Sequence, residues 1–236
     1  MSFYTKEGLY SAIHEYKGQL GYDTSDCGID MIKCCEKIGI TIEKVPFKTK
    51  GLRGMAVIGD TKEEDIILLN SNRNRIEQNF DCGHEVVHLG LHRDTGLRTF
   101  NCIDKIYAKQ DEYVEWQANE GAAELFVPYT ALLPLIKFKF HTFTSSAAIR
   151  QFKTEMSQLF SVSPKVIEFR FESLKYEIHQ FLNGVSIENL EILSISQQQR
   201  ANINVKSLKD MEYDFIAKES KVREKHSFIN FDAVMF

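Results

Sequence analysis

The sequence predicts an α+β fold with a small mixed or antiparallel sheet, followed by a region that is mostly helical. Short runs with strand character lie between residues 40 and 69, apolar residues recur at helical spacing around them, and the chain beyond Pro128 has helical character. The length of 236 residues slightly exceeds that of a typical single domain. We expect units over residues 1–134, 135–184 and 185–236, the last being an extension whose role the sequence does not indicate.

Each predicted element rests on a local pattern of residues. Helices are predicted where apolar side chains recur at helical spacing between capping residues, and strands where they alternate or form short apolar runs. The second and third strands flank a charged connection, which indicates a β-hairpin or a meander. In chain order we expect helices over 5–20, 26–38, 76–91, 111–126, 145–160 and 164–182, and strands over 40–45, 55–58 and 66–69.

The composition is that of an ordinary globular protein. Hydrophobic residues make up 43% of the chain and charged residues 26%, which excludes wholesale disorder. The net charge of −4 argues against nucleic-acid binding through bulk charge. No secretory signal or membrane-spanning stretch is visible, and the five cysteines lack C-x-x-C spacing, which favours reduced thiols. We therefore expect a cytoplasmic protein without a membrane partner.

The most informative stretch is an H-E-x-x-H motif formed by His84, Glu85 and His88. Its separation of four residues puts both histidines on one face of a predicted helix, where they can bind one metal ion. Glu85 lies about 100° further round the helix, so its carboxylate can reach a water at the metal without being a ligand. This pattern is typical of zinc hydrolases, in which the glutamate transfers the proton of the attacking water. The alternative is an amphipathic helix with one core histidine and one solvated histidine.

Two histidines leave a catalytic zinc ion short of a third protein ligand. His92 lies about 12 Å of helical rise beyond His84, too far to share its ion, so a packing or rim role suits it better. A glutamate from the helix predicted over 111–126 would complete the set, although a helical glutamate is usually only surface charge. Among the four candidates Glu115 has Asn119 one turn further on, whose amide could hold the free N–H of a ligating histidine. The candidates are Glu112, Glu115, Glu120 and Glu124.

Together these blocks resemble the ImmA/IrrE-type metallopeptidases. The pattern of that family pairs an H-E-x-x-H helix ending in L-x-H with a second block, E-x-x-A-N-x-F-A-A-E-L-L-M-P. Here the second block runs from Glu115 to Pro128. A G-I-x-I-x-x-V-P strand from Gly39 also fits, and the likeness covers roughly residues 8–175.

The resemblance implies a zincin-like metallopeptidase domain. In it His84, His88 and Glu115 would bind one Zn²⁺ or another divalent ion, and Glu85 would be the catalytic acid and base. The chain departs from the family pattern at three places, which we expect to affect packing and substrate fit. Gly121 replaces a bulky aromatic residue, Cys82-Gly83 replaces an alanine before the first histidine, and Phe126-Val127 replaces Leu-Met.

The resemblance also implies a substrate, because the family cleaves specific transcriptional repressors, often of mobile elements or stress responses. The residues alone indicate only a metal-dependent hydrolase. The alternative is a non-catalytic regulatory module that binds a repressor or DNA and whose metal site is structural or vestigial, but an intact Glu85 favours catalysis. We expect the strand at residues 55–57 to form an edge that pairs with an extended peptide. Tyr107, Tyr113 and the arginines are candidates for stabilising the oxyanion.

The helices predicted over 145–160 and 164–182 resemble a helix-turn-helix, because only a short turn joins them. A DNA-recognition helix normally belongs to a basic surface. The second helix carries three basic residues against three acidic ones, so its net charge is zero. We therefore favour repressor docking or plain packing over DNA binding. The residues compared are Lys165, Arg170, Lys175, Glu168, Glu172 and Glu177.

Overall fold

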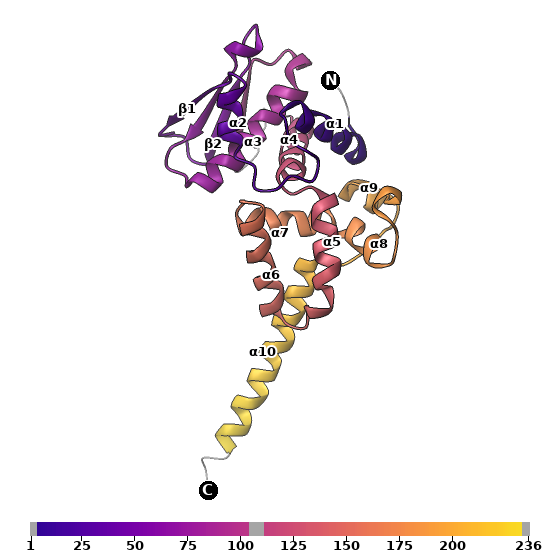
Figure 1. Cartoon of the computed structure of the whole chain (residues 1–236). Coiled ribbons are helices and arrows are strands. Elements are labelled where there is room, and N and C mark those ends of the chain that lie inside the picture. The colour runs from indigo at the N-terminus through magenta and orange to yellow at the C-terminus, as the bar shows by residue number, and fades with distance from the viewer. Residues whose placement is uncertain (1–3, 104–110, 233–236) are drawn as a thin grey trace.

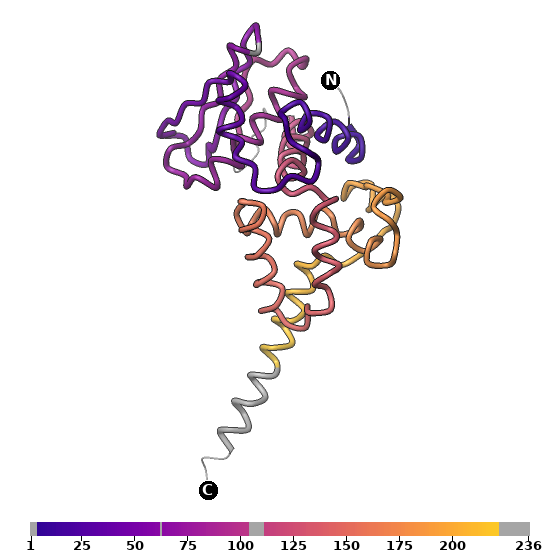
Figure 2. The backbone as a smooth tube through the Cα atoms, viewed as in Figure 1, coloured from indigo at the N-terminus to yellow at the C-terminus, as the bar shows by residue number. Residues whose placement is uncertain are grey.

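The computed structural model describes residues 4–103 and 111–232, without the side chains of Lys62 and of residues 222–232 (Figure 1). Over these residues a four-stranded sheet with helices α1 to α4 forms one end of the molecule, and α5 to α10 form the other. Figure 2 shows the chain crossing between the two ends at the junction of α4 (Glu112–Phe126) and α5 (Tyr129–Lys139). The predicted α+β class is confirmed.

The sheet is mixed and has the order β1-β3-β2-β4. β1 (Thr41–Val45) runs parallel to β3 (Ile66–Asn70). β2 (Leu52–Val57) is antiparallel to both β3 and β4 (Thr99–Ile103), so the predicted hairpin of β2 and β3 is confirmed. The prediction that residues 55–57 form a free edge is wrong, because β2 pairs on both sides within the sheet.

Helix α3 (Arg75–Leu91) lies against one face of this sheet (Figure 1). Alternate residues of the central strands, among them Ala56 and Ile67, are fully buried in the core beside it. The helix begins with a capping box, in which Asn74 accepts from the backbone N–H of Glu77 and the Glu77 carboxylate accepts from the Asn74 backbone. The capping box and the buried face thus fix the position of the helix that carries the H-E-x-x-H motif.

Three further helices complete this end of the molecule. α1 (Lys6–Gln19) packs on α4, and α2 (Met31–Lys37) packs on α3. The predicted start of α2 at residue 26 is early, because the side chain of Asp30 caps the helix. Its end is as predicted, since Gly39 follows it with φ of +86°, a conformation that favours glycine.

The other end is helical, as predicted. The helix expected over 164–182 is interrupted at Leu174, which has φ −101° and ψ 11°. The carbonyl of the preceding residue, Ser173, accepts a hydrogen bond from Nζ of Lys6, 2.5 Å away, so it is bound to another part of the molecule. The elements are α6 (Ser146–Leu159), α7 (Pro164–Ser173), α8 (Lys175–Leu182), α9 (Ile195–Arg200) and α10 (Leu208–Asp232).

One hydrophobic core runs through both ends, from Leu9 of α1 to Leu208 of α10. The division into units at residues 134 and 184 therefore stays a prediction. No single helix in the described ranges is long and apolar enough to cross a membrane. The one pair that is apolar enough when taken together, α4 with the helical residues 129–142, is bent by 62°.

Candidate metal centre

Two histidines and a glutamate converge between α3 and α4. His84 and His88 lie one turn apart on α3, with their Nε2 atoms 3.1 Å from each other. Glu115, in the first turn of α4, places one carboxylate oxygen 3.5 Å from Nε2 of His84 and the other 3.6 Å from Nε2 of His88. All three side chains are buried. The structure thus brings together the three residues that the sequence proposed as ligands.

The spacing of these donors fits a single metal ion. Ligand atoms that lie about 2.0–2.2 Å from a tetrahedral ion are about 3.3–3.6 Å from one another, close to the separations seen here. Two neutral imidazole nitrogens 3.1 Å apart repel each other unless a proton or a cation lies between them. Burial, and then the neighbouring His84 and His92, lowers the pKa of His88 well below its usual value. That imidazole is therefore neutral and available to a metal.

A chain of hydrogen bonds orients the second histidine. Nδ1 of His88 lies 2.9 Å from Nδ1 of His92, and Nε2 of His92 lies 2.7 Å from Oε1 of Gln117. The amide oxygen of Gln117 can only accept, so His92 carries its proton on Nε2 and accepts at Nδ1 from His88. The Nε2 lone pair of His88 is then free and faces Glu115. His92 thus holds the imidazole of His88 in place and has both of its own ring nitrogens engaged, in line with the packing role expected from its distance.

Glu85 lies beside the three donors and is fully buried. It packs against the backbone of β2 at Gly54, where an added Cβ would come within 2.9 Å of its Oε1. Burial, and then the negative charges of Glu115 and Asp81, raises the pKa of Glu85 well above its usual value. The backbone N–H of Ala56 in β2 acts against this rise, although neither oxygen has a hydrogen-bond partner of ordinary geometry among the described residues. A carboxylate in this state is primed to take up a proton.

The structure separates the four glutamates of α4 that the sequence left in competition. Glu112 is exposed, whereas Glu120 and Glu124 form ion pairs with the buried guanidinium of Arg170. Only Glu115 reaches both histidines.

Asn119 does not make the contact that the sequence suggested. Its amide Nδ2 donates to the backbone carbonyl oxygen of Glu115, 2.9 Å away, one turn back along α4. The histidine N–H that it was expected to hold is instead bound by His92. The physical reason is that an asparagine one turn further along a helix readily bonds the backbone of its own helix.

A charged cluster near the first histidine gave no signal in the sequence. The buried Asp81 lies one turn before His84 on α3, and its Oδ2 is 2.6 Å from Nε of Arg73. Its Oδ1 is 3.8 Å from the guanidinium of Arg53, which comes from β2. Burial raises the pKa of Asp81, although both arginines act to lower it. The two arginines are 20 positions apart in the sequence, so no spacing could link them.

A second set of donors shares His84. Ligand atoms of His84, Glu85 and Cys102 all lie within 4.8 Å of one another, as do those of the first set. Burial raises the pKa of the Cys102 thiol well above its usual value. The separations of 3.1 to 3.6 Å within the set that contains Glu115 are those expected around one tetrahedral ion.

The departures from the family pattern compensate one another in the packing. A Cβ added at Gly83 would lie 2.2 Å from the ring of Phe126, so the glycine makes room for that phenylalanine. At Gly121 a Cβ would lie 3.0 Å from Ile13 of α1 and 3.2 Å from Val87 of α3, so these side chains fill the space. Both glycines let α4 approach α3 closely, which brings Glu115 to the histidines.

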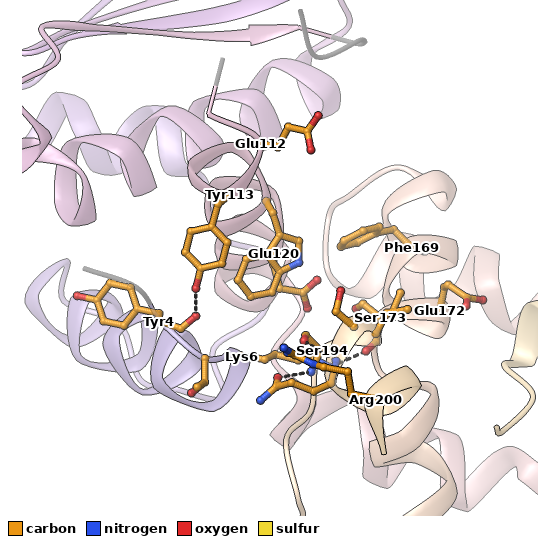
Figure 3. Close-up of a pocket in the computed structure, with 15 residues that line it drawn as sticks. Tyr4, Lys6, Glu112, Tyr113, Glu120, Phe169, Glu172, Ser173, Ser194 and Arg200 are labelled. Atoms are coloured by element: carbon orange, nitrogen blue, oxygen red, sulfur yellow. Dashed lines mark hydrogen bonds between the residues drawn. The ribbon is translucent and has the colours of Figure 1, made fainter. Parts of the chain in front are cut away.

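The side chains proposed to stabilise the oxyanion differ in where they lie. Tyr107 lies outside the described residues. The hydroxyl of Tyr113 donates to the backbone carbonyl of Tyr4, so it is bound to the segment that precedes α1 (Figure 3). Of the arginines, Arg53 is among the charges that act on Glu85, so it stays a candidate.

Comparison with known families agrees with this geometry. The model of the Peptidase M78 family, described as the IrrE N-terminal-like domain, matches residues 35–172 and so includes α3, α4 and α7. The curated proteins contain no match to this chain. Since the match covers more than half of the sequence, the chain belongs to the Peptidase M78 family of zincin-like metallopeptidases.

Proposed function

We propose that this protein is a metal-dependent endopeptidase, with His84, His88 and Glu115 as ligands of one Zn²⁺ or another divalent ion. The observation that carries the proposal is the convergence of these three donors at separations suited to one ion, with Glu85 beside them. A structural zinc site closes all four positions with protein ligands, whereas three ligands leave one position for the reaction. The family match supports the same activity.

The chain's own residues would perform the proton transfers. A divalent ion bound here would polarise the scissile carbonyl and acidify a water molecule. Glu85 would accept the proton of the attacking water and then deliver it to the nitrogen of the leaving amine. Its burial and raised pKa suit both tasks, because the carboxyl group must hold the proton between the two steps. His92 and Gln117 would keep the imidazole of His88 in one orientation throughout.

We further propose that the substrate is a transcriptional repressor cleaved at a specific site in the cytoplasm. The resemblance to the ImmA/IrrE-type enzymes supports the substrate class. The five cysteines are all free thiols, which suits a reducing compartment. An extended peptide could pair with β4, which is an edge of the sheet in the described residues and places Cys102 close to Glu85.

The test compares three variants for metal content and for cleavage of peptides and of repressors. Glu85→Gln should keep one ion per chain and lose roughly 10²- to 10⁴-fold in turnover, because only the proton carrier is removed. His84→Ala and Glu115→Ala should lose both metal and turnover. A Glu85→Gln variant that cleaves at the wild-type rate would refute the role of Glu85. A metal-loaded wild type that binds a repressor without cutting it would instead support the non-catalytic module.

A further inference from the structure

A groove runs between α4 and α7, beside the proposed metal centre. It consists of two cavities of about 800 Å³ and 610 Å³, which share Glu112, Trp116 and Phe169 in their walls. Figure 3 shows the smaller cavity, with Glu112 on α4 and Phe169 on the facing helix α7, and Ser194 and Arg200 at its far side. Volumes of this size are typical of ligand sites.

The larger cavity adjoins the metal centre through two of its wall residues. Asn119 lies in its wall and is hydrogen-bonded to the backbone of Glu115. Arg53 also lines it, pairs with Asp81 and is among the charges that act on Glu85. Neither cavity is lined by His84, Glu85, His88 or Glu115 themselves, so Asn119 and Arg53 are the link between the groove and the residues proposed for catalysis.

The wall of the larger cavity combines large apolar side chains with cations. Phe80, Trp116 and Phe169 supply the apolar part, and Phe169 remains 40% exposed although α7 is otherwise largely packed in the core. Exposed aromatic side chains around a concave site are typical of binding surfaces. Lys165, in the first turn of α7, forms no ion pair with any described residue, and Arg73, which is paired with Asp81, also lines the cavity.

The contacts of the basic residues in the predicted helix-turn-helix bear on whether it could bind DNA. Arg170 is buried on two glutamates of α4, and Nζ of Lys175 is bound to Glu172, 2.9 Å away. Of the three basic residues in the predicted recognition helix, Lys165 is the one without an ion pair among described residues, and it faces the groove. The first turn of α7 therefore forms a wall of the cleft, which leaves little basic surface for DNA.

We propose that this groove selects the substrate, by binding a peptide segment that carries a large apolar side chain next to an acidic one. The apolar side chain would lie between Trp116 and Phe169, and the acidic one would pair with Lys165. Glu77 and Glu112 on the same rim confine this preference for negative charge to the neighbourhood of Lys165. The proposal rests on the proposed peptidase function and adds the chemistry of its substrate.

Trp116 is the only tryptophan in the chain, so its fluorescence reports directly on the groove. We would titrate metal-free protein with synthetic twelve-residue peptides that differ only in a central Phe-Asp, Ala-Asp or Phe-Lys pair. The Phe-Asp peptide should change the emission saturably, and both altered peptides should bind about tenfold more weakly. Equal binding of all three peptides, or no saturable change with any, would overturn the proposal.

Matched variants separate the groove from the fold. Phe169→Ala should weaken binding of the Phe-Asp peptide about tenfold and raise KM for its cleavage, and Lys165→Glu should remove the preference for Asp over Lys. Phe138→Ala is the control, because Phe138 is 72% exposed on α5 and lines neither cavity. It should leave binding and cleavage unchanged.

The outcomes distinguish this proposal from the peptidase function. If the wild type cleaves but Phe169→Ala behaves like Phe138→Ala, the groove does not select the substrate while the enzyme remains a peptidase. A different outcome is that the peptides bind in the predicted order, with weaker binding to Phe169→Ala, while metal-loaded protein cleaves none of them. In that case the groove binds the predicted peptide, but the protein is not a peptidase.

Discussion

Helix α4 carries buried glutamates in two contrasting environments. In what we name the arginine cluster, Glu120 and Glu124 lie 2.9 Å and 2.5 Å from the guanidinium of Arg170, whose Nε donates to the carbonyl oxygen of Val127. In the metal centre, Glu115 faces two imidazoles, and the described residues supply it with no buried lysine or arginine at ion-pair distance.

The contrast separates buried charges that are paired within the chain from buried donors that are not. Burying a charge costs several kcal/mol unless a partner compensates it. The arginine cluster supplies that partner from within the chain and joins α4 to α7. The metal centre keeps His84, His88 and Glu115 together without one, and such uncompensated groups are characteristic of functional sites. A divalent cation would complete the second cluster as Arg170 completes the first.

The largest effect is expected from breaking the arginine cluster. Arg170→Met leaves Glu120 and Glu124 buried without a cation, so the free energy of unfolding in urea should fall by about 3–5 kcal/mol. Arg150→Met is the matched control, because its pair with Glu212 is partly exposed and should contribute no more than ~1 kcal/mol. A loss below that of the control would mean that the cluster does not hold the fold together.

Adding a metal ion should stabilise the protein through the cluster of His84, His88 and Glu115. Zn²⁺ at about a thousand times its dissociation constant should raise the free energy of unfolding of metal-free protein by about 4 kcal/mol. Glu115→Gln should lose most of this increment, because a neutral amide is a much weaker ligand. Thermal unfolding with and without Zn²⁺ measures both. An equal increment in the wild type and in Glu115→Gln would place the bound ion elsewhere.

The hydrogen bonds behind His88 should matter for the metal rather than for the fold. Gln117→Leu removes the acceptor that fixes His92, so Zn²⁺ affinity should fall by about 10- to 100-fold. Competition with a chelator measures this affinity. Gln151→Leu, at an exposed position on α6, should leave it unchanged. Unaltered affinity in Gln117→Leu would show that the chain from Gln117 to His88 does not orient the ligand.

The smallest effect concerns the space that lets α4 approach α3. Gly83→Ala should cost roughly 1–3 kcal/mol of unfolding free energy, because the new Cβ would overlap the ring of Phe126. Adding Phe126→Leu should restore much of the loss, which a double-mutant cycle in urea would detect. Additive losses would show that the two departures from the family pattern do not compensate each other.

The fold was predictable where a pattern is local. Helix α3 follows from the helical spacing of its apolar residues, and the hairpin of β2 and β3 from two apolar runs around a charged connection. β4 was missed, because its five residues include Thr99 and Asn101 on the outer face and give only a weak apolar run. The break at Leu174 was also missed, since it accompanies a hydrogen bond from Lys6, 167 positions away, to the preceding carbonyl.

The candidate site was likewise predictable only where its residues belong to a local motif or to the family pattern. His84, Glu85 and His88 form a motif within five residues, and Glu115 was singled out by its own helix and the family pattern. The polar groups around them were not predictable, because Gln117 of α4 bonds His92 at the end of α3, and Arg53 of β2 and Arg73 both pair with Asp81. Asn119 had the right spacing along α4 but bonds its own backbone instead.

We expect one cation to complete the cluster of His84, His88 and Glu115. Anomalous X-ray diffraction at the zinc absorption edge, on crystals of the zinc-loaded protein, would locate that cation. One strong peak per chain should lie about 2.0–2.2 Å from Nε2 of both histidines and from a carboxylate oxygen of Glu115. A peak bound by other residues, or no peak between α3 and α4 in zinc-saturated crystals, would contradict this expectation.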